Sequence, residues 1–467
     1  MNTLRKLGLG SLLLTTSLSI NAETLLGAYQ GNQGWAMDEV VAMENWQGKK
    51  HAVINLYSNW TPSAEDLLFR YQLDNVWSHG SVPMISWEPT LSGETPSDIE
   101  TQIANGAYDT FINSWGNKLK IFLSGIDGVY GTEDDRRVFI RMAHEPNGTW
   151  YPWSASAGEN TPNDYIDMWR RTHDQLSALG LDDTHVQWVW AVNNVDIGDY
   201  TAEDYYPGDD YVNWVGMDGF NWGSDYNWSS WQSPPQIFEN MRQRLNDLAP
   251  EKPVAIPEVA STSNNIHGTV NFGKDAWFEQ FSQYIKDSDI RMIAWFNQDK
   301  EADWQVFDGA NGAEEVDGTK VYPAYKAAIQ STDIVAADTT NRRILSDAQF
   351  RGDVTANPNN QESAKTCEIS YRITAKWDGG YVAKVSASAN FLIPQNWTLD
   401  WESASSEQIS YGWNAIVQQS DSDVSATPPS WWKWVKAGTS PSFGFVGKGE
   451  AQLPSTAMLN GVHCTIN

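Results

Sequence analysis

The clearest chemical signal is a glutamate, Glu145, in the stretch RMAHEPNGTWYPW at residues 141–153. The same stretch adds a histidine, an amide and three large aromatic side chains: His144, Asn147, Trp150, Tyr151 and Trp153. A second glutamate, Glu258, lies in KPVAIPEVAST. A protonated carboxyl can donate to a leaving oxygen while an ionised one attacks carbon. Two such glutamates about 5 Å apart would form the apparatus of a glycosidase that retains anomeric configuration.

A barrel of parallel strands is the scaffold that brings these residues together. Eight apolar, strand-like runs alternate with helical patterns over residues 23–332, which predicts a (β/α)₈ TIM barrel. The runs are 24–29, 51–57, 82–87, 137–143, 185–191, 211–218, 252–258 and 291–297. Glu145 follows the fourth run and Glu258 ends the seventh. Barrel enzymes carry their sites at the carboxyl ends of the strands, so both glutamates are expected at the mouth.

Aromatic residues gather at the same strand ends. Flat, rigid rings are suited to stacking on the C–H faces of sugars. The candidates for substrate binding, besides His144 and Asn147, are Trp150, Trp153, Trp190, Phe220 and Trp295. A single tryptophan in a strand is more often core, and only the grouping of several with the two acids favours a glycan site.

The last part of the chain has a different pattern. Residues 333–364 are rich in small and polar side chains and are interpreted as a linker. Residues 365–467 show strict alternation without a helical period, which predicts a β-sandwich module. The only two cysteines, Cys367 and Cys464, are expected to form a disulfide if the protein is exported.

The amino terminus and the charge restrict location and partners. Residues 1–22 combine a basic start, a short apolar stretch and a small residue at Ala22, which predicts a signal peptide and a secreted, extracellular protein. No later stretch is apolar enough to cross a membrane. The net charge of −28 argues against nucleic acid as a partner. We expect a monomer without cofactor or metal. The acidic turn at 127–135 leaves open a calcium ion, although its spacing favours a solvated turn.

Residues 23–330 resemble glycoside hydrolase family 26. The resemblance rests on HEPNGTW, with Trp150 five residues after Glu145, on KPVAIPEVAST and on IAWFNQDKEADW. It implies Glu145 as acid/base and Glu258 as nucleophile, with His144 and Trp295 lining the subsite around the cleaved bond.

The resemblance leaves the substrate open. Most members cut β-1,4-mannan, so an endo-β-mannanase is the first expectation. The alternatives are mixed-linkage β-glucan and β-1,3-xylan. Members that cut mixed-linkage β-glucan have sequences similar to GFNWG and HEPNGTWYPW. One departure from the family pattern is Phe220, which stands where a tyrosine often bonds the nucleophile; Tyr226 is a possible substitute.

Residues 367–464 resemble carbohydrate-binding module family 2. The shared motifs include KWDGGYVAKVSASAN, YGWNA and SWWKWVKAG. The resemblance implies a line of exposed tryptophans, Trp377, Trp413 and Trp431, that binds crystalline cellulose or xylan. A binding protein whose barrel has lost activity is the alternative of another class, and the presence of both glutamates speaks against it.

Overall fold

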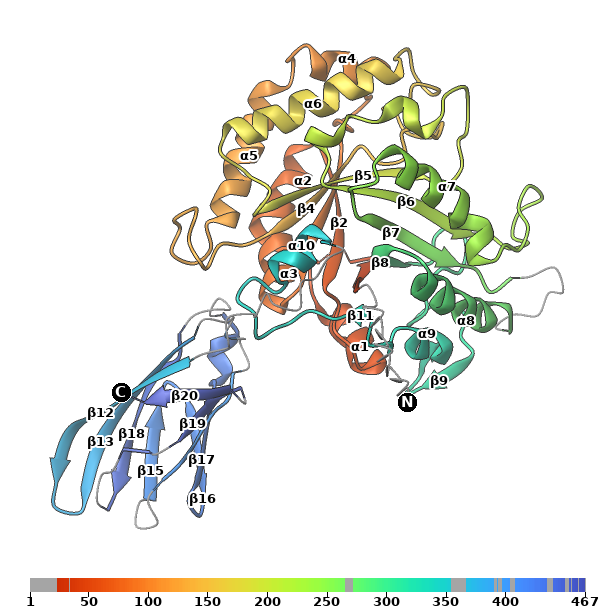
Figure 1. Ribbon diagram of the computed structural model, residues 1–467. Coiled ribbons are helices and arrows are strands. Elements are labelled where there is room, and N and C mark those ends of the chain that lie inside the picture. Colours follow the sequence, from red (N-terminus) through yellow and green to blue (C-terminus); the bar gives the residue numbers. More distant parts are fainter. Residues whose placement is uncertain are drawn as a thin grey trace, which may run out of the picture.

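A computed structural model describes most of the chain. The residues left outside the description are 1–22, 33, 265–271, 354–366, 390–392, 394–396, 404–407, 435–439, 450–452, 455, 461 and 467. The predicted signal peptide therefore lies outside the described residues. Figure 1 shows a helix-clad barrel, in red to cyan, and a module of strands in blue.

Eight parallel strands form the barrel, and pairing of the first with the eighth closes it. They are β1 (Thr24–Gln30), β2 (Val53–Asn59), β3 (Val82–Glu88), β4 (Val138–Met142), β5 (Val186–Asn193), β6 (Trp214–Asn221), β7 (Val254–Ser261) and β8 (Ile290–Asn297). Nearly every residue in them is buried, as expected for strands covered on both faces. The predicted fold class is confirmed. Glu258 lies within β7 and not at its end.

Helices connect the strands and cover the outside of the barrel (Figure 1). They are α1 (Asp38–Gln47), α2 (Pro62–Leu67), the π-helical η1 (Leu68–Gln72), α3 (Leu73–His79), α4 (Ile99–Ala104), α5 (Asp109–Leu123), α6 (Pro162–Ala178), the 3₁₀ turns η2 (Ala202–Tyr205) and η3 (Asp209–Tyr211), α7 (Pro234–Leu248), α8 (Phe272–Asp287) and α9 (Pro323–Ala328). Helix α6 begins as its sequence predicts, with a capping box between Thr161 and Asp164 and with Pro162 at its start. A small hairpin, β9 (Glu314–Val316) and β10 (Thr319–Val321), precedes α9.

The first half of the predicted linker is part of the barrel's packing, which corrects that boundary. Strand β11 (Ile334–Val335) pairs with β1, and α10 (Asp347–Arg351) places the fully buried Phe350 against Phe139 of β4. The indole of Trp214, at the start of β6, donates to the carbonyl of Phe350 at 3.2 Å. Phe139 and Trp214 belong to the amino-terminal half of their strands, so α10 closes the bottom of the barrel, opposite the mouth.

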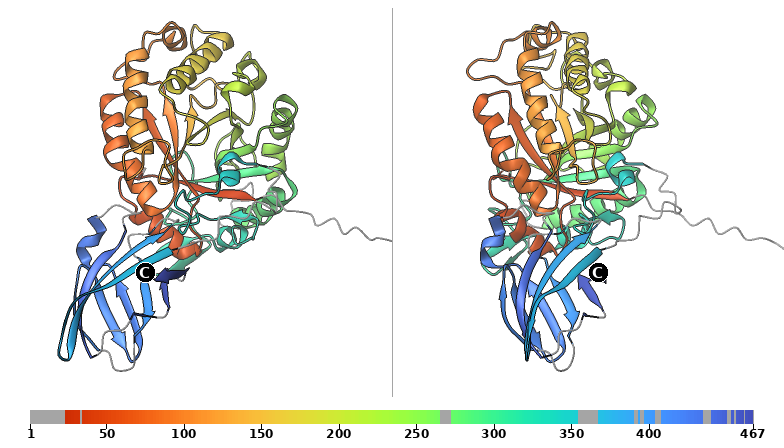
Figure 2. Two further views of the ribbon diagram at one scale, coloured as in Figure 1. Left: turned by 60° about the vertical axis from the view of Figure 1, so that its left-hand side comes forward. Right: turned by 90° about the vertical axis from the view of Figure 1, so that its left-hand side faces the viewer.

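The described residues of the carboxy-terminal module form antiparallel strands, one parallel pair of strands and one 3₁₀ turn. They are β12 (Cys367–Trp377), β13 (Gly380–Ala389), β14 (Leu399–Glu402), β15 (Gln408–Trp413), β16 (Ile416–Ser420), β17 (Asp423–Thr427), β18 (Ser442–Lys448), β19 (Ala457–Leu459) and β20 (Val462–Ile466), with the 3₁₀ turn η4 (Ser430–Trp434) before β18. The strands run side by side along the module (Figure 2). Trp397, Trp401 and Trp432 are buried between them, which confirms the predicted sandwich.

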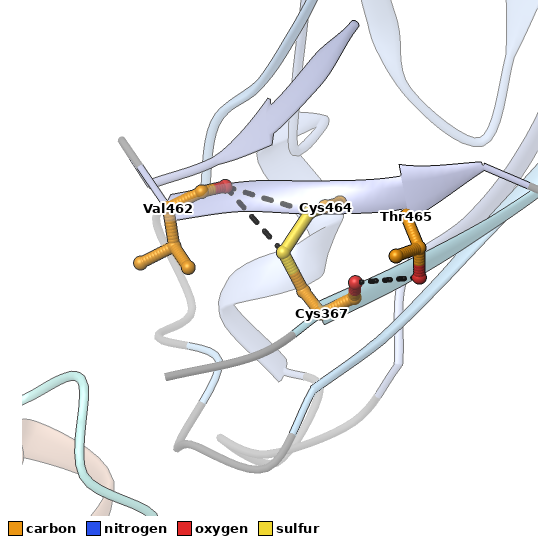
Figure 3. The surroundings of a disulfide bond; sticks show 4 residues. All are labelled: Cys367, Val462, Cys464 and Thr465. Carbon is orange, nitrogen blue, oxygen red and sulfur yellow. Dashed lines mark hydrogen bonds between the residues drawn. A yellow bond between two sulfur atoms is a disulfide. The ribbon is translucent and has the colours of Figure 1, made fainter. Parts of the chain in front are cut away.

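A disulfide joins the two strands at the ends of the module. Cys367 of β12 lies opposite Cys464 of β20, with 4.5 Å between their Cα atoms and a sequence separation of 97 residues. The Thr465 hydroxyl donates to the Cys367 carbonyl at 3.3 Å beside it (Figure 3). The predicted disulfide is confirmed. None of the helices in the described part of the chain has the length and apolarity to cross a membrane.

Candidate active site

The chain after β4 turns into an uncommon backbone conformation. Ala143 and Glu145 both have positive φ, at 43° and 53°. Backbone bonds to the neighbouring strands hold this conformation: the Ala143 amide donates to the Trp87 carbonyl at 3.0 Å and the Glu145 amide to the Ala191 carbonyl at 2.9 Å. Strain of this kind concentrates at functional sites.

The carboxyl of Glu145 is buried and bonded by an indole. Trp150 Nε1 donates to Glu145 Oε2 at 2.8 Å. Gly148 makes this approach possible, since a Cβ there would lie 2.6 Å from the Trp150 ring. Burial raises the pKa of Glu145 to about 7, the charge of Glu258 adds to the rise, and the Trp150 bond opposes it. Glu145 therefore keeps its proton at pH values below about 7.

The carboxylate of Glu258 has the opposite environment. Its Oε1 accepts from the Tyr57 hydroxyl of β2 and from the Arg141 guanidinium of β4. His144 Nε2 lies 3.8 Å from the same oxygen. A guanidinium and a hydroxyl group both donate to this oxygen and fix the direction of the carboxylate.

Arg141 is the centre of the polar network under the mouth. It is fully buried and donates to Ser86 of β3 at 2.8 Å, to Asp218 of β6 at 2.6 Å and to Tyr57 at 3.2 Å, in addition to Glu258. Burial alone lowers the pKa of Arg141, but the charges of Asp218 and Glu258 outweigh it and hold that pKa well above its usual value.

Sequence reasoning missed Arg141, Tyr57 and Asp218. The available signal was an arginine inside the apolar run RVFIRMA, because a buried strand tolerates a guanidinium only when carboxylates pair with it.

His144, Tyr151 and Trp153 form an aromatic cluster, in which the His144 ring lies 3.8 Å from Glu258. His144 Nε2 lies 2.9 Å from the Tyr151 hydroxyl, and burial, with the nearby charge of Arg141, lowers its pKa well below the usual value. Trp153 is fully buried, stacks on Tyr151 at 4.3 Å and donates to the His144 carbonyl. The imidazole is therefore neutral, and the buried Trp153 holds the backbone of His144 in place.

The side chain of Asn147 is bonded to the end of β5 and to the loop after β5. Its amide nitrogen donates to the Asn193 carbonyl at 3.0 Å and to Asp196 at 2.9 Å, and its oxygen accepts from the Asn193 amide at 2.8 Å. With 1 % of its surface exposed, Asn147 ties the turn after β4 to the loop after β5. The expectation that it contacts a sugar does not fit this placement.

Two of the predicted aromatic residues lie on the outside of the barrel wall. Trp190 contacts Tyr206 after η2 and is fully buried. Trp295 packs against Phe278 of α8 and Tyr325 of α9. Both rings fill the layer between strands and helices, so their expected place in a substrate subsite is corrected.

Phe220 and Tyr226 also differ from expectation in their partners. Phe220 is half-buried beside Phe296, at 5.9 Å, on the inner side of the wall. The Tyr226 hydroxyl donates to the Glu301 carbonyl at 3.0 Å and does not take the place of a nucleophile-bonding tyrosine. Tyr57 of β2 supplies that hydroxyl to Glu258 instead.

The three tryptophans predicted for the module are partly or largely exposed. Trp377 and Trp431 expose 51 % and 48 % of their surface, and Trp413 is half-buried. Trp377 lies over Gly380 and Trp413 over Gly444, two glycines whose lack of a side chain makes room for the rings. Trp377 and Trp413 belong to β12 and β15 of the same sheet.

The acidic turn satisfies its carboxylates internally. Asp134 accepts from the backbone amides of Ile126 and Asp127, and Asp135 accepts from that of Gly131 at 2.5 Å and pairs with His185 at 2.8 Å. Across the described residues, no three His, Cys, Asp or Glu side chains gather as a metal ion would require.

A parallel barrel whose mouth holds two buried glutamates in opposite environments defines the glycoside hydrolase class. Residues 19–262 match the model of glycosyl hydrolase family 26, and residues 367–464 match that of a cellulose binding domain. The first match spans more than half of the chain, and the protein belongs to glycosyl hydrolase family 26. Both predicted resemblances are confirmed.

Three curated relatives show how the similarity is distributed. Endoglucanase H of Acetivibrio thermocellus is 32 % identical over 292 residues, which cover 61 % of this chain and 29 % of the relative. Endoglucanase A of Thermobispora bispora is 37 % identical over 95 residues, 20 % of this chain and 21 % of the relative. A mannan endo-1,4-β-mannosidase of Bacillus subtilis is 26 % identical over 216 residues, 42 % of this chain and 58 % of the relative. The chain therefore spans less than two thirds of each relative.

Proposed function

We propose that the protein hydrolyses internal β-glycosidic bonds of a polysaccharide with retention of configuration. Glu258 attacks the anomeric carbon, and Glu145 protonates the leaving oxygen and then activates water. The observation that carries this proposal is the contrast between the two carboxyls: Glu145 is desolvated with its pKa raised to about 7, while Glu258 accepts from Arg141 and Tyr57. Environments that separate two carboxyls in this way assign acid and nucleophile.

The same contrast supplies the second half of the reaction. The negative charge of Glu258 contributes to the raised pKa of Glu145. Formation of the glycosyl ester removes that charge, so the pKa of Glu145 falls and its carboxylate becomes a suitable base for water. The neutral His144, 3.8 Å from Glu258, adds no positive charge that would weaken the nucleophile.

A β-glucan is the substrate we propose first. The relative with 32 % identity over 61 % of the chain is named an endoglucanase, and the one named a mannosidase shares 26 % over 42 %. The higher identity to the endoglucanase and the GFNWG motif together favour mixed-linkage β-1,3-1,4-glucan over the β-1,4-mannan expected from the family as a whole. β-1,4-Mannan is the second candidate, supported by the mannosidase relative.

The module and the disulfide support a protein that works outside the cell on wall material. Residues 367–464 match a cellulose binding domain, and Trp377, Trp413 and Trp431 are the residues we propose to contact cellulose or xylan. Disulfides persist in oxidising compartments, so the Cys367–Cys464 bond favours secretion.

A substrate panel tests the proposal. Initial rates on barley β-glucan, mannan, glucomannan, β-1,3-xylan and cellulose are compared by reducing-sugar release, and the anomer of the first product is followed by NMR. We expect the highest rate on barley β-glucan and a β-anomer as first product. The highest rate on mannan would replace the substrate, an α-anomer would contradict retention, and no rate on any polymer would contradict the activity.

A further inference from the structure

A continuous series of aromatic rings leads from the nucleophile's partner to the rim of the barrel. Tyr57 touches Tyr29 at 4.9 Å, Tyr29 stacks on Phe296 at 4.7 Å, and Phe296 meets Phe220 at 5.9 Å. The series continues through Trp222 to Trp228, with steps of 6.0 and 5.3 Å. It joins β2, β1, β8 and β6 and ends in the loop between β6 and α7.

Exposure rises along this series. Tyr29 and Phe296 expose 5 % and 8 % of their surface, Phe220 and Trp222 are half-buried, and Trp228 exposes 65 %. Trp228 is the most exposed tryptophan among the described residues. Trp228 thus presents a flat, rigid ring to solvent, a shape on which the C–H face of a sugar can stack.

The loop that presents Trp228 is held in place. Tyr226 lies nearly parallel to Trp228, with 17° between the planes and 5.2 Å between the centroids, and its hydroxyl donates to the Glu301 carbonyl in the loop after β8. The Ser229 hydroxyl donates to the Gly223 carbonyl at 2.9 Å, and the Ser224 amide to the Asn264 carbonyl at 3.1 Å. A surface that is already fixed loses little conformational entropy when a ligand binds to it.

We propose that Trp228, backed by Tyr226, is a distal subsite that stacks on a hexose ring of a bound β-glycan several units from the cleaved bond. The occupant is the same polysaccharide chain that enters the mouth, because Trp228 lies in the loop after β6 and its loop is bonded to the one after β8, and both loops open at the carboxyl ends of the barrel strands. This inference rests on the proposed function. It concerns binding only, because among the contacts of the described residues there is none between Trp228 and either glutamate.

The test is a comparison of Trp228→Ala with Trp35→Ala in the full-length protein. Trp35 is a matched control: it exposes 53 %, and it also pairs with a tyrosine, Tyr71 of η1, at 4.8 Å. Trp35 lies in the loop between β1 and α1, its carbonyl accepts from Asn75 of α3, and its ring contacts Tyr71 and not a member of the ring series. Trp228→Phe retains a smaller stacking surface and serves as a graded variant.

The readouts are KM and kcat on barley β-glucan and on its oligosaccharides of increasing length, and the rate on a short aryl β-glycoside. For Trp228→Ala we expect KM on the long substrates to rise roughly three- to tenfold at unchanged kcat, because a stacking contact made equally in ground and transition states is lost. Trp228→Phe is expected to fall between, while Trp35→Ala and all rates on the aryl glycoside remain as in the wild type.

Three outcomes would overturn the inference. They are an unchanged KM for Trp228→Ala on every length, an equal rise for Trp35→Ala, and a fall of kcat on the aryl glycoside with a lower melting temperature, which would mark a structural role. If the wild-type protein does not hydrolyse β-glucan, the proposed substrate is contradicted, and the same variants are then compared on the polymer of the panel that the wild type does hydrolyse.

Discussion

Trp150 and Trp431 expose almost the same fraction of their surface, 49 % and 48 %, in regions of opposite character. Trp150 stands at the barrel mouth, where its N–H bonds a carboxyl whose pKa is raised, beside a buried arginine and two further acids. Trp431 stands on the module, where its neighbour is the buried Trp432. The difference teaches that exposure alone does not assign a role to a tryptophan. At the mouth the indole N–H bonds the carboxyl of Glu145 and so affects its pKa, whereas on the module the indole ring provides an exposed flat surface.

The strongest way to break this comparison is to remove the nucleophile. Glu258→Ala is expected to lower kcat on soluble glucan by about 10⁴-fold or more, because no covalent intermediate forms. Binding to cellulose should be unchanged. Added azide should restore turnover and give a product of inverted configuration, seen by NMR. A variant with near wild-type turnover would contradict the assignment.

Removal of the acid has a smaller and selective effect. Glu145→Ala is expected to slow polymer hydrolysis by roughly 10²- to 10⁴-fold, while aryl glycosides with good leaving groups lose much less, since they need little protonation. Rates on both substrates are compared at one pH. Equal losses would indicate a structural role for Glu145.

On the module, simultaneous replacement of Trp377, Trp413 and Trp431 by Ala is expected to weaken cellulose binding by about 10- to 100-fold, through loss of stacking area. A pull-down on crystalline cellulose measures it. Activity on soluble glucan is the control and should be unchanged. A thermal melt separates lost contact from an unfolded module, and a folded variant that still binds fully would refute the platform.

The boundary between the two regions is tested by truncation. A chain ending at 353 should retain the barrel's stability and its activity on soluble glucan. A chain ending at 332 loses β11 and α10, and Phe350→Ala alone should lower the free energy of unfolding by about 3 to 5 kcal/mol, because it empties the bottom of the barrel. Urea unfolding compares the three. Equal stability of both truncations would show that α10 is dispensable.

The smallest effect expected is a shift of the pH profile. Glu145 must be protonated, so activity on polymer should fall as pH rises through about 7. The Trp150 N–H favours the ionised form, and Trp150→Phe should therefore raise the pKa and move the falling limb to higher pH. Burial also raises the pKa of Glu88 to about 7, but Trp150 does not bond it. A limb that stays in place would assign the fall to another group such as Glu88.

Much of the fold was readable from the sequence, for a physical reason. The barrel strands are apolar on both faces, so their runs stand out against the polar helix surfaces. Because both faces are apolar, the sequence does not reveal which face of each strand points into the barrel. The sequence therefore predicts Trp190 and Trp295 at the mouth, whereas in the structure both rings face the helical layer.

The site was predictable only in part. The two glutamates can be found from the sequence because each stands at the end of an apolar run. The partners of Glu258 come from strands far apart in sequence, with Tyr57 201 residues away. The bottom closure was missed because α10 is short and polar, and Phe350 is the one side chain in it that is buried.

The disulfide of the module also has a mechanical meaning. The chain from the barrel enters the module at Cys367, the first residue of β12, and Trp377 of the proposed cellulose-binding line stands at the far end of the same strand. Tension between an anchored surface and a moving barrel would therefore pass along β12. Where the chain enters the module, the disulfide transfers part of this force to β20. Detaching β12 from the sheet would therefore require breaking a covalent bond in addition to the hydrogen bonds between the strands.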